Sequence, residues 1–268
     1  MIVYKYVHPS RTTILEAGLI RFTQSPALND PFETTPNMHR LEESFREYGV
    51  RIVEETSYES VLDYINHRSR VRERVKEHIR NFLTTNQNKY AILSLSKTNN
   101  NLLMWAHYCD SHRGFVLGFD STHAFFQTRR VRAFGVLTEV RYSDERPVMP
   151  APDKWDGSQA QIEQVVGAAD LAELFFYTKS RDWAYEQELR MVANPNIADH
   201  YIEGPDGQSI FLFKFPPDCL TEIVFGIRMQ DDLKRHLTRV IKQQYPHVKV
   251  FQAKLNQERF DLDITPVS

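Results

Sequence analysis

The stretch Trp183-Ala184-Tyr185-Glu186-Gln187-Glu188-Leu189-Arg190-Met191 decides how the fold is interpreted. Charged residues alternate with other side chains from position 186 onward, and a period of two is typical of a β-strand. On a strand over 186–191, Glu186, Glu188 and Arg190 share one face. Two carboxylates on one face repel each other unless water or a cation neutralises them. This face is therefore either an outward face with a salt bridge or the wall of a cleft where a carboxylate stabilises positive charge.

The chain on both sides of this stretch predicts an α+β fold. A short helix capped by Ser10, with Gly18 in its left-handed C-terminal turn, is expected after the first strand. A short aromatic helix is expected at Leu102–Cys109, and further helices at Gln159–Phe176 and Asp231–Tyr245. Runs of β-branched and aromatic residues predict the strands Ile2–Val7, Leu19–Thr23, Ala91–Ser96, Phe115–Asp120, 131–142, Glu186–Ala193, Ile210–Phe215, Glu222–Ile227 and Val248–Ala253. We expect one domain over 1–268, built on a mixed or antiparallel sheet.

Residues 38–84 are expected to form a helical insertion within this domain. The charges are unevenly distributed: 39–60 are rich in glutamate, whereas 67–80 hold six Lys and Arg residues against two Glu. A solvated helix face with ion pairs between neighbouring turns explains the basic segment. A patch that binds phosphates or an acidic partner is the less common alternative for such a charge run. Both interpretations stay open.

Composition and missing motifs exclude several classes of protein. Lys and Arg number 33 against 35 Asp and Glu, so the net charge of −2 does not indicate a nucleic-acid-binding protein as a whole. No glycine-rich phosphate loop, Gly-x-Ser-x-Gly elbow or His-Glu-x-x-His motif is present, which argues against P-loop NTPases, Rossmann dehydrogenases, serine hydrolases and zincins. No secretory signal or membrane-spanning run occurs, so we expect a cytoplasmic protein without membrane contact.

Metal binding is not expected. Cys109 and Cys219 match no metal or redox spacing. His107, Cys109, Asp110 and His112 are close in sequence and are metal-ligating types, but neighbours along a short helix do not point to one centre.

The segment Met104–Tyr108 combines aromatic and polar side chains on one predicted helix. Most aromatic helices of this kind pack into a core, where a histidine is hydrogen-bonded and structural. Alternatively, Trp105 and Tyr108 form an aromatic wall for a base or a nicotinamide ring, with His107 as a donor at its edge. We predict that this segment, residues 29–33, 113–115 and 183–190 converge on one cleft.

The chain resembles a widespread bacterial family of uncharacterised domains. The segments that carry this resemblance follow the same order along nearly the whole chain: Leu28-Asn29-Asp30-Pro31-Phe32-Glu33, Met104–Tyr108, Arg113-Gly114-Phe115, Lys179-Ser180, Trp183, Tyr185-Glu186-x-Glu188-x-Arg190 and Phe225-Gly226. The family carries no agreed activity.

A second resemblance suggests chemistry. A first strand with Tyr4-Lys5-Tyr6, a short helix ending in Gly18-Leu19 and a late strand with Glu are similar to ADP-ribosyltransferases, especially the toxin branch that modifies nucleic acid. The resemblance implies that Glu188 and Glu186 are catalytic and that NAD is the substrate. The departure is that the first site usually holds Arg or His, whereas His8 lies later here. The residues assigned to NAD binding are Lys5, Tyr6, Asn29, Trp105, His107, Tyr108, Arg113 and Arg190.

The expected mechanism breaks a glycosidic bond. A late-strand Glu stabilises oxocarbenium character on the ribose, and the second acid deprotonates an acceptor or water, without a metal. The expected setting is a bacterial toxin or defence system, with a macromolecular acceptor or nucleic acid docking on the basic segment 67–80. One alternative is a metal-dependent nuclease that uses Asp120, Glu186 and Glu188. The other is a non-catalytic module that binds a partner through 38–84.

Overall fold

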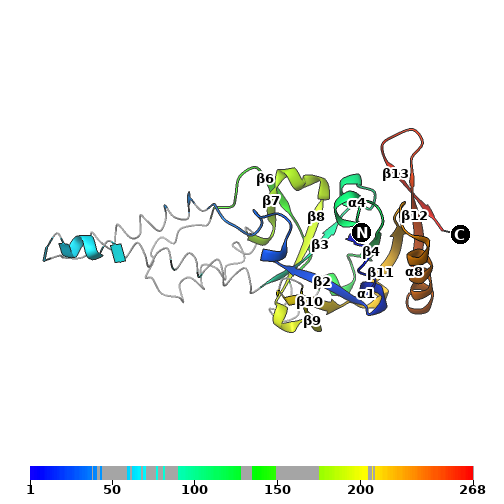
Figure 1. The fold of residues 1–268 in the computed structure, drawn as a ribbon, viewed down its shortest axis with the longest axis horizontal. Helices are drawn as coiled ribbons and strands as arrows, with labels where there is room; N and C mark the ends of the chain where they lie inside the picture. Colours follow the sequence, from blue (N-terminus) through cyan, green and yellow to red (C-terminus); the bar gives the residue numbers. More distant parts are fainter. Residues whose placement is uncertain are drawn as a thin grey trace. The chain divides into compact units, whose positions relative to one another are not determined.

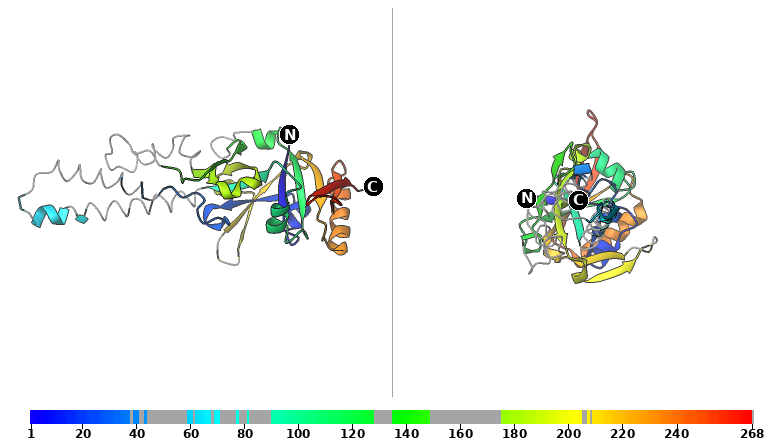
Figure 2. Two further views of the ribbon diagram at one scale, coloured as in Figure 1. Left: turned by 90° about the horizontal axis from the view of Figure 1, so that it is seen from above. Right: turned by 90° about the vertical axis from the view of Figure 1, so that its left-hand side faces the viewer.

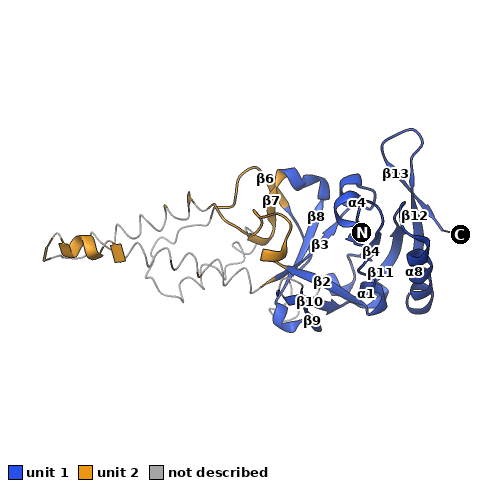
Figure 3. Cartoon of the chain, in the orientation of Figure 1, with its two compact units in different colours: residues 1–23, 91–140, 182–268 blue, residues 24–90, 141–181 orange. Residues whose placement is uncertain are grey.

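The computed structural model of the chain divides into two compact units, which Figure 3 colours separately. Unit 1 comprises residues 1–23, 91–140 and 182–268, and unit 2 comprises residues 24–90 and 141–181. The structure describes residues 1–37, 39–40, 43, 59–60, 62–67, 69–70, 77, 81, 90–127, 135–148, 175–204, 207 and 209–267. Most of the expected insertion at 38–84, most of its basic segment and most of the helix expected at 159–176 lie outside the described residues.

Unit 1 is built on a large mixed sheet, which confirms the α+β class (Figure 1). The strand order is β13-β12-β11-β4-β1-β3-β2-β10-β9, with β8 paired to β3 and β5 paired to β8. The pairings given for these strands are antiparallel except β11 with β12. The bounds are β1 Ile2–Val7, β2 Leu19–Gln24, β3 Ala91–Ser96, β4 Phe115–Asp120, β5 Thr138–Glu139, β8 Glu188–Ala193, β9 His200–Glu203, β10 Ser209–Lys214, β11 Leu220–Phe225, β12 Lys249–Leu255 and β13 Leu262–Pro266.

Short helices accompany the sheet. They are α1 Thr13–Glu16, α4 Leu102–Tyr108, α5 Ala124–Gln127 and α8 Asp231–Gln244. The amphipathic helix α8 buries Leu237, Val240 and Ile241, and it lies beside β12 in Figure 1 and in the left view of Figure 2. Among the described residues, no helix has the length and apolar composition needed to cross a bilayer.

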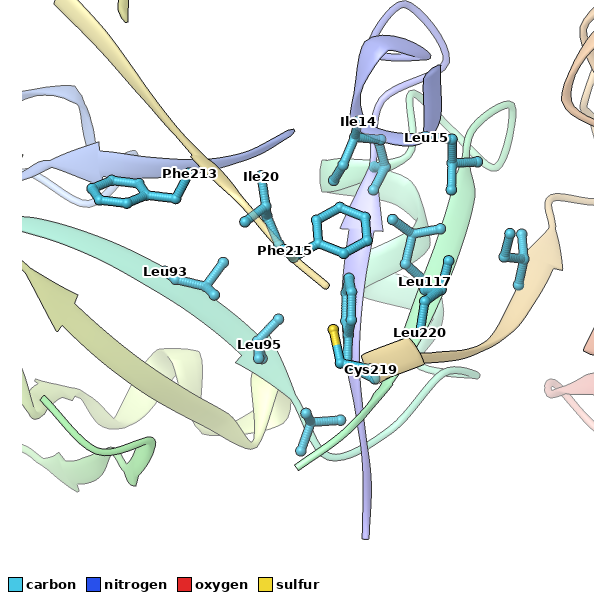
Figure 4. Close-up of a cluster of buried hydrophobic side chains, with 14 of the residues drawn as sticks. Ile14, Leu15, Ile20, Leu93, Leu95, Leu117, Phe213, Phe215, Cys219 and Leu220 are labelled. Carbon is cyan, nitrogen blue, oxygen red and sulfur yellow. The ribbon is translucent and has the colours of Figure 1, made fainter. Parts of the chain in front are cut away.

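The alternation of side chains along the central strands creates two apolar clusters. On β1, Val3 and Val7 enter the larger cluster and Tyr6 enters the smaller one, as a period of two requires. Figure 4 shows the larger cluster, in which Phe215 lies between Ile20 and the side chains of α1 and β4. The smaller cluster contains Trp105 of α4.

Unit 2 has less regular structure among its described residues. Strand β6 (Arg141–Ser143) pairs in parallel with β7 (Thr178–Ser180), and a 3₁₀ turn covers Ser25–Ala27. The rings of Tyr90 and Phe176 meet edge to face with centroids 5.0 Å apart.

Several predicted elements are confirmed and two details are wrong. Strands β3 and β4 have the predicted bounds, and Gly18 has the left-handed φ of 65° expected at the end of α1. Ser10 does not cap α1, because the helix starts after Thr12 and has no side-chain cap. The strand expected from Glu186 begins only at Glu188, since the preceding residues 181–186 form a 3₁₀ helix. Strands β7, β9 and β13 were not predicted.

Candidate functional site

Charged side chains of unit 1 are buried where β8 begins. Glu186, Glu188 and Arg190 are 3%, 4% and 0% exposed. Burying a charge without a partner is costly, so each of these groups requires compensation. The partners come from β8 itself, from β1 and from α4.

Glu188 and Arg190 form a two-pronged ion pair. The Arg190 Nε donates to Glu188 Oε1 at 2.7 Å, and its Nη2 donates to Oε2 at 3.0 Å. The two side chains share a face of β8, opposite Ser96 and Ser94 of β3 in the register. This part of the period-two prediction is confirmed. An opposite charge at this distance favours the ionised form of the carboxyl group.

Glu186 is not on the same strand face, which corrects the prediction from the sequence. It ends the 3₁₀ helix, and Gln187 follows in a left-handed conformation with φ 45°. The Ser96 hydroxyl donates to the Glu186 carbonyl oxygen at 2.7 Å, and the Lys97 N–H donates to the Gln187 carbonyl at 3.1 Å. These bonds hold the chain in the turn, so the alternation begins only at Glu188.

The carboxylate of Glu186 instead accepts a hydrogen bond from helix α4. The Tyr108 hydroxyl donates to Glu186 Oε1 at 2.5 Å. Asn101 connects the same two segments, because its Nδ2 donates to the Tyr185 carbonyl at 2.9 Å while its Oδ1 accepts from the N–H groups of Leu103 and Met104. One asparagine thus caps α4 and holds the residue before Glu186.

Lys5 of β1 adds a positive charge to the assembly formed by Glu186, Glu188 and Arg190. Its Nζ donates to the Ser94 carbonyl oxygen at 2.9 Å. Burial, together with the nearby charges of Arg11 and Arg21, lowers the pKa of Lys5 to about 8, and Glu188 and Glu186 act in the opposite direction. The last two effects show that Lys5 lies within electrostatic range of both carboxylates.

The aromatic residues of the predicted wall lie partly in the core. Trp105 is fully buried, and its Nε1 donates to the Asn99 carbonyl at 2.7 Å. Its ring contacts Tyr6 edge to face and stacks on His112 with centroids 6.0 Å apart. His107 is exposed. This placement fits the packing interpretation of the helix, and a role of these residues in NAD binding stays a prediction.

The turn after α4 is tightly built. Asp110, Ser111 and His112 have φ values of 46°, 54° and 70°, a left-handed run that is costly for residues other than glycine. Arg113 is exposed and its Nη1 donates to the Asp110 carbonyl at 3.3 Å, so it bonds within its own turn. Gly114 passes close to β1, because a Cβ there would lie 2.0 Å from the Val7 oxygen.

The segment around Asn29 belongs to unit 2 and is described there. Asn29 is exposed, and Asp30 Oδ1 accepts from the Phe32 N–H at 2.9 Å. Glu33 and Lys179 form a buried ion pair at 3.1 Å, which the sequence analysis did not predict although both residues had been singled out. Convergence of residues 29–33 with the segments of unit 1 stays a prediction.

The described residues contain no group of three His, Cys, Asp or Glu side chains that could hold a metal ion. Cys109 is buried and donates to the Phe115 carbonyl, and burial raises the pKa of its thiol. Asp120 accepts from the backbone and hydroxyl of Thr122 in its own turn.

Part of this region matches the sequence model of a known family. Residues 104–191 match the model of a family described as a protein of unknown function (DUF2971). The matched segment runs from α4 into β8 and therefore contains Tyr108, Glu186, Glu188 and Arg190. The comparison with curated proteins and the comparison with solved structures each gave no match. The similarity to a family of uncharacterised domains is thus confirmed for this part of the chain.

Proposed function

We propose that the protein consumes NAD: it breaks the bond between nicotinamide and ribose and passes ADP-ribose to an acceptor or to water. One observation carries this proposal. Two buried carboxylates have different partners, since Glu188 is held by a guanidinium and Glu186 by a phenol hydroxyl. Different environments for two acids are how one site assigns them different roles.

The energetic cost of burying these charged side chains supports a functional role for them. Arg190, Glu186 and Glu188 bring charges of both signs into the interior of unit 1, and Lys5 adds a positive charge within electrostatic range of both carboxylates. Well-packed apolar side chains at such positions often give equal or greater stability. Buried charges with perturbed protonation are more common at functional sites than elsewhere.

In the proposed reaction, Glu188 faces the ribose. As the C–N bond breaks, its electron pair leaves with nicotinamide, and positive charge builds on the ribose carbon. An ionised carboxylate fixed by Arg190 stabilises that charge without having to reorient. The acceptor then forms its bond to the same carbon, and its proton passes to Glu186.

Positive charge for the NAD diphosphate comes, in this proposal, from the first strand. Lys5 is the residue that the resemblance to ADP-ribosyltransferases assigns to NAD, and Arg11 and Arg21 lie within electrostatic range of it. Ammonium and guanidinium groups are the usual partners of phosphate oxygens. A macromolecular acceptor, nucleic acid at the basic segment 67–80, and a toxin or defence setting remain parts of the proposal.

The test is nicotinamide release from NAD by the purified protein, with and without a cell extract as a source of acceptor. Release in either condition supports the proposal. A protein that releases none in both conditions contradicts it. In that case Glu186→Ala and Glu188→Ala variants that keep the cellular phenotype would favour the non-catalytic partner-binding module.

A further inference from the structure

We infer that Tyr108 is the positioning residue of Glu186, and that its hydroxyl holds this carboxylate ionised and in one orientation. As a statement about catalysis, the inference rests on the proposed function. As a statement about the pair of side chains, it can be tested without NAD.

The geometry fixes the pair from both sides. Tyr108 is the last residue of α4, whose first turn is capped by Asn101. The same asparagine holds the Tyr185 carbonyl, and Ser96 holds the Glu186 carbonyl at 2.7 Å. Neither partner can shift without breaking a hydrogen bond of its own segment. The hydrogen bond between the Tyr108 hydroxyl and Glu186 therefore joins two anchored groups.

The Tyr108 hydroxyl, as a hydrogen-bond donor, affects the protonation of the Glu186 carboxylate. A phenol O–H that donates to a carboxylate stabilises the charged form and opposes its protonation. Three charged groups nearby act on Glu186 in known directions: Lys5 from β1 favours the ionised form, Glu188 opposes it, and Arg190 offsets Glu188.

The variant Tyr108→Phe removes the donor and keeps the ring. Loss of a hydrogen bond to a charged group raises the pKa of the carboxyl, so the acid limb of the pH–rate profile should move up by about one pH unit. Tyr245→Phe is the matched control, because the buried Tyr245 hydroxyl donates to the Leu15 carbonyl and not to a carboxylate. An unchanged acid limb in Tyr108→Phe overturns the inference.

A double-mutant cycle in unfolding supplies a readout independent of turnover. The variants are Tyr108→Phe, Glu186→Gln and both together, with the amide keeping the shape and removing the charge. We expect the effects on the unfolding equilibrium constant to be non-additive by about fivefold or more at neutral pH, and additive once acid has protonated Glu186. Additive effects at neutral pH overturn the pairing. Non-additivity without any nicotinamide release retains the pair and contradicts the proposed function alone.

Discussion

Arg190 donates to both carboxylate oxygens of Glu188, two positions away on the same face of β8, and neither side chain is more than 4% exposed. At this depth of burial, solvent compensates poorly for a missing partner. The consequences differ for removing one charge and for removing both.

Arg190→Met should destabilise the protein by about 3–5 kcal/mol, because it leaves the Glu188 carboxylate buried without its cation. The double variant Glu188→Leu, Arg190→Met should recover most of that loss, since a buried pair can be replaced by apolar residues at little cost. Chemical denaturation of the three proteins measures this. A double variant as unstable as Arg190→Met alone would show that the pair has a further structural role.

The pH dependence of stability should report on Lys5. The pKa of Lys5 is about 8 in the folded protein, against the ordinary value of 10.5 expected in the unfolded chain. Between these two pH values, Lys5 therefore holds its proton more often in the unfolded chain than in the folded protein. The free energy of unfolding contributed by Lys5 therefore rises as pH increases through this window, and the penalty is fully present below about pH 8. Lys5→Met should lack this rise. Equal slopes in the two proteins would contradict the burial of the ammonium group.

Gly114→Ala should be strongly destabilising. Its Cβ would lie 2.0 Å from the Val7 carbonyl oxygen and 3.1 Å from the Cys109 Cα, so the turn after α4 must move away from β1. We expect a loss of about 3 kcal/mol or more, at or above the upper end of ordinary overpacking. Gly207→Ala is the control: φ is 74° there, but no atom lies within 4 Å of the new Cβ. A lower melting temperature for Gly207→Ala than for Gly114→Ala would contradict the close approach of Gly114 to the Val7 carbonyl.

The sequence was informative where the local pattern agrees with the tertiary structure. Strands β3 and β4 were predicted with their bounds because each is a buried apolar run between turn residues. Glu186 was misplaced because the break at Gln187 depends on hydrogen bonds from Ser96 and Lys97, which are about ninety positions away. Alternation along one segment contains no information about such distant partners.

The same limit applies to the candidate site. A period of two places Glu188 and Arg190 on one face of β8, and the sequence predicted this shared face. The bonds from Tyr108 to Glu186 and from Lys5 to Ser94 join elements far apart in the chain, and no spacing indicates them. Residue type singled out Tyr108 and Lys5, but the structure was needed to show what they contact.

Glu186→Gln should separate the two halves of the proposed reaction. If Glu186 accepts the acceptor proton, its loss should slow transfer to a macromolecule more than it slows nicotinamide release, and free ADP-ribose should accumulate. Chromatography of ADP-ribose alongside nicotinamide measures the ratio. A variant in which both products fall in parallel would place Glu186 in the bond-breaking step instead.

The most direct test of the central claim is the rate of nicotinamide release by Glu188→Gln. This change keeps the side-chain shape and removes the charge at some cost in stability, so turnover is compared on protein shown to be folded, and it should fall by about a hundredfold or more. Glu222→Gln is the matched control, because Glu222 is a half-buried carboxylate on β11 that accepts from Asn99 and takes no part in the assembly. We predict that Glu222→Gln releases nicotinamide at the wild-type rate. A folded Glu188→Gln protein that does the same would contradict the account.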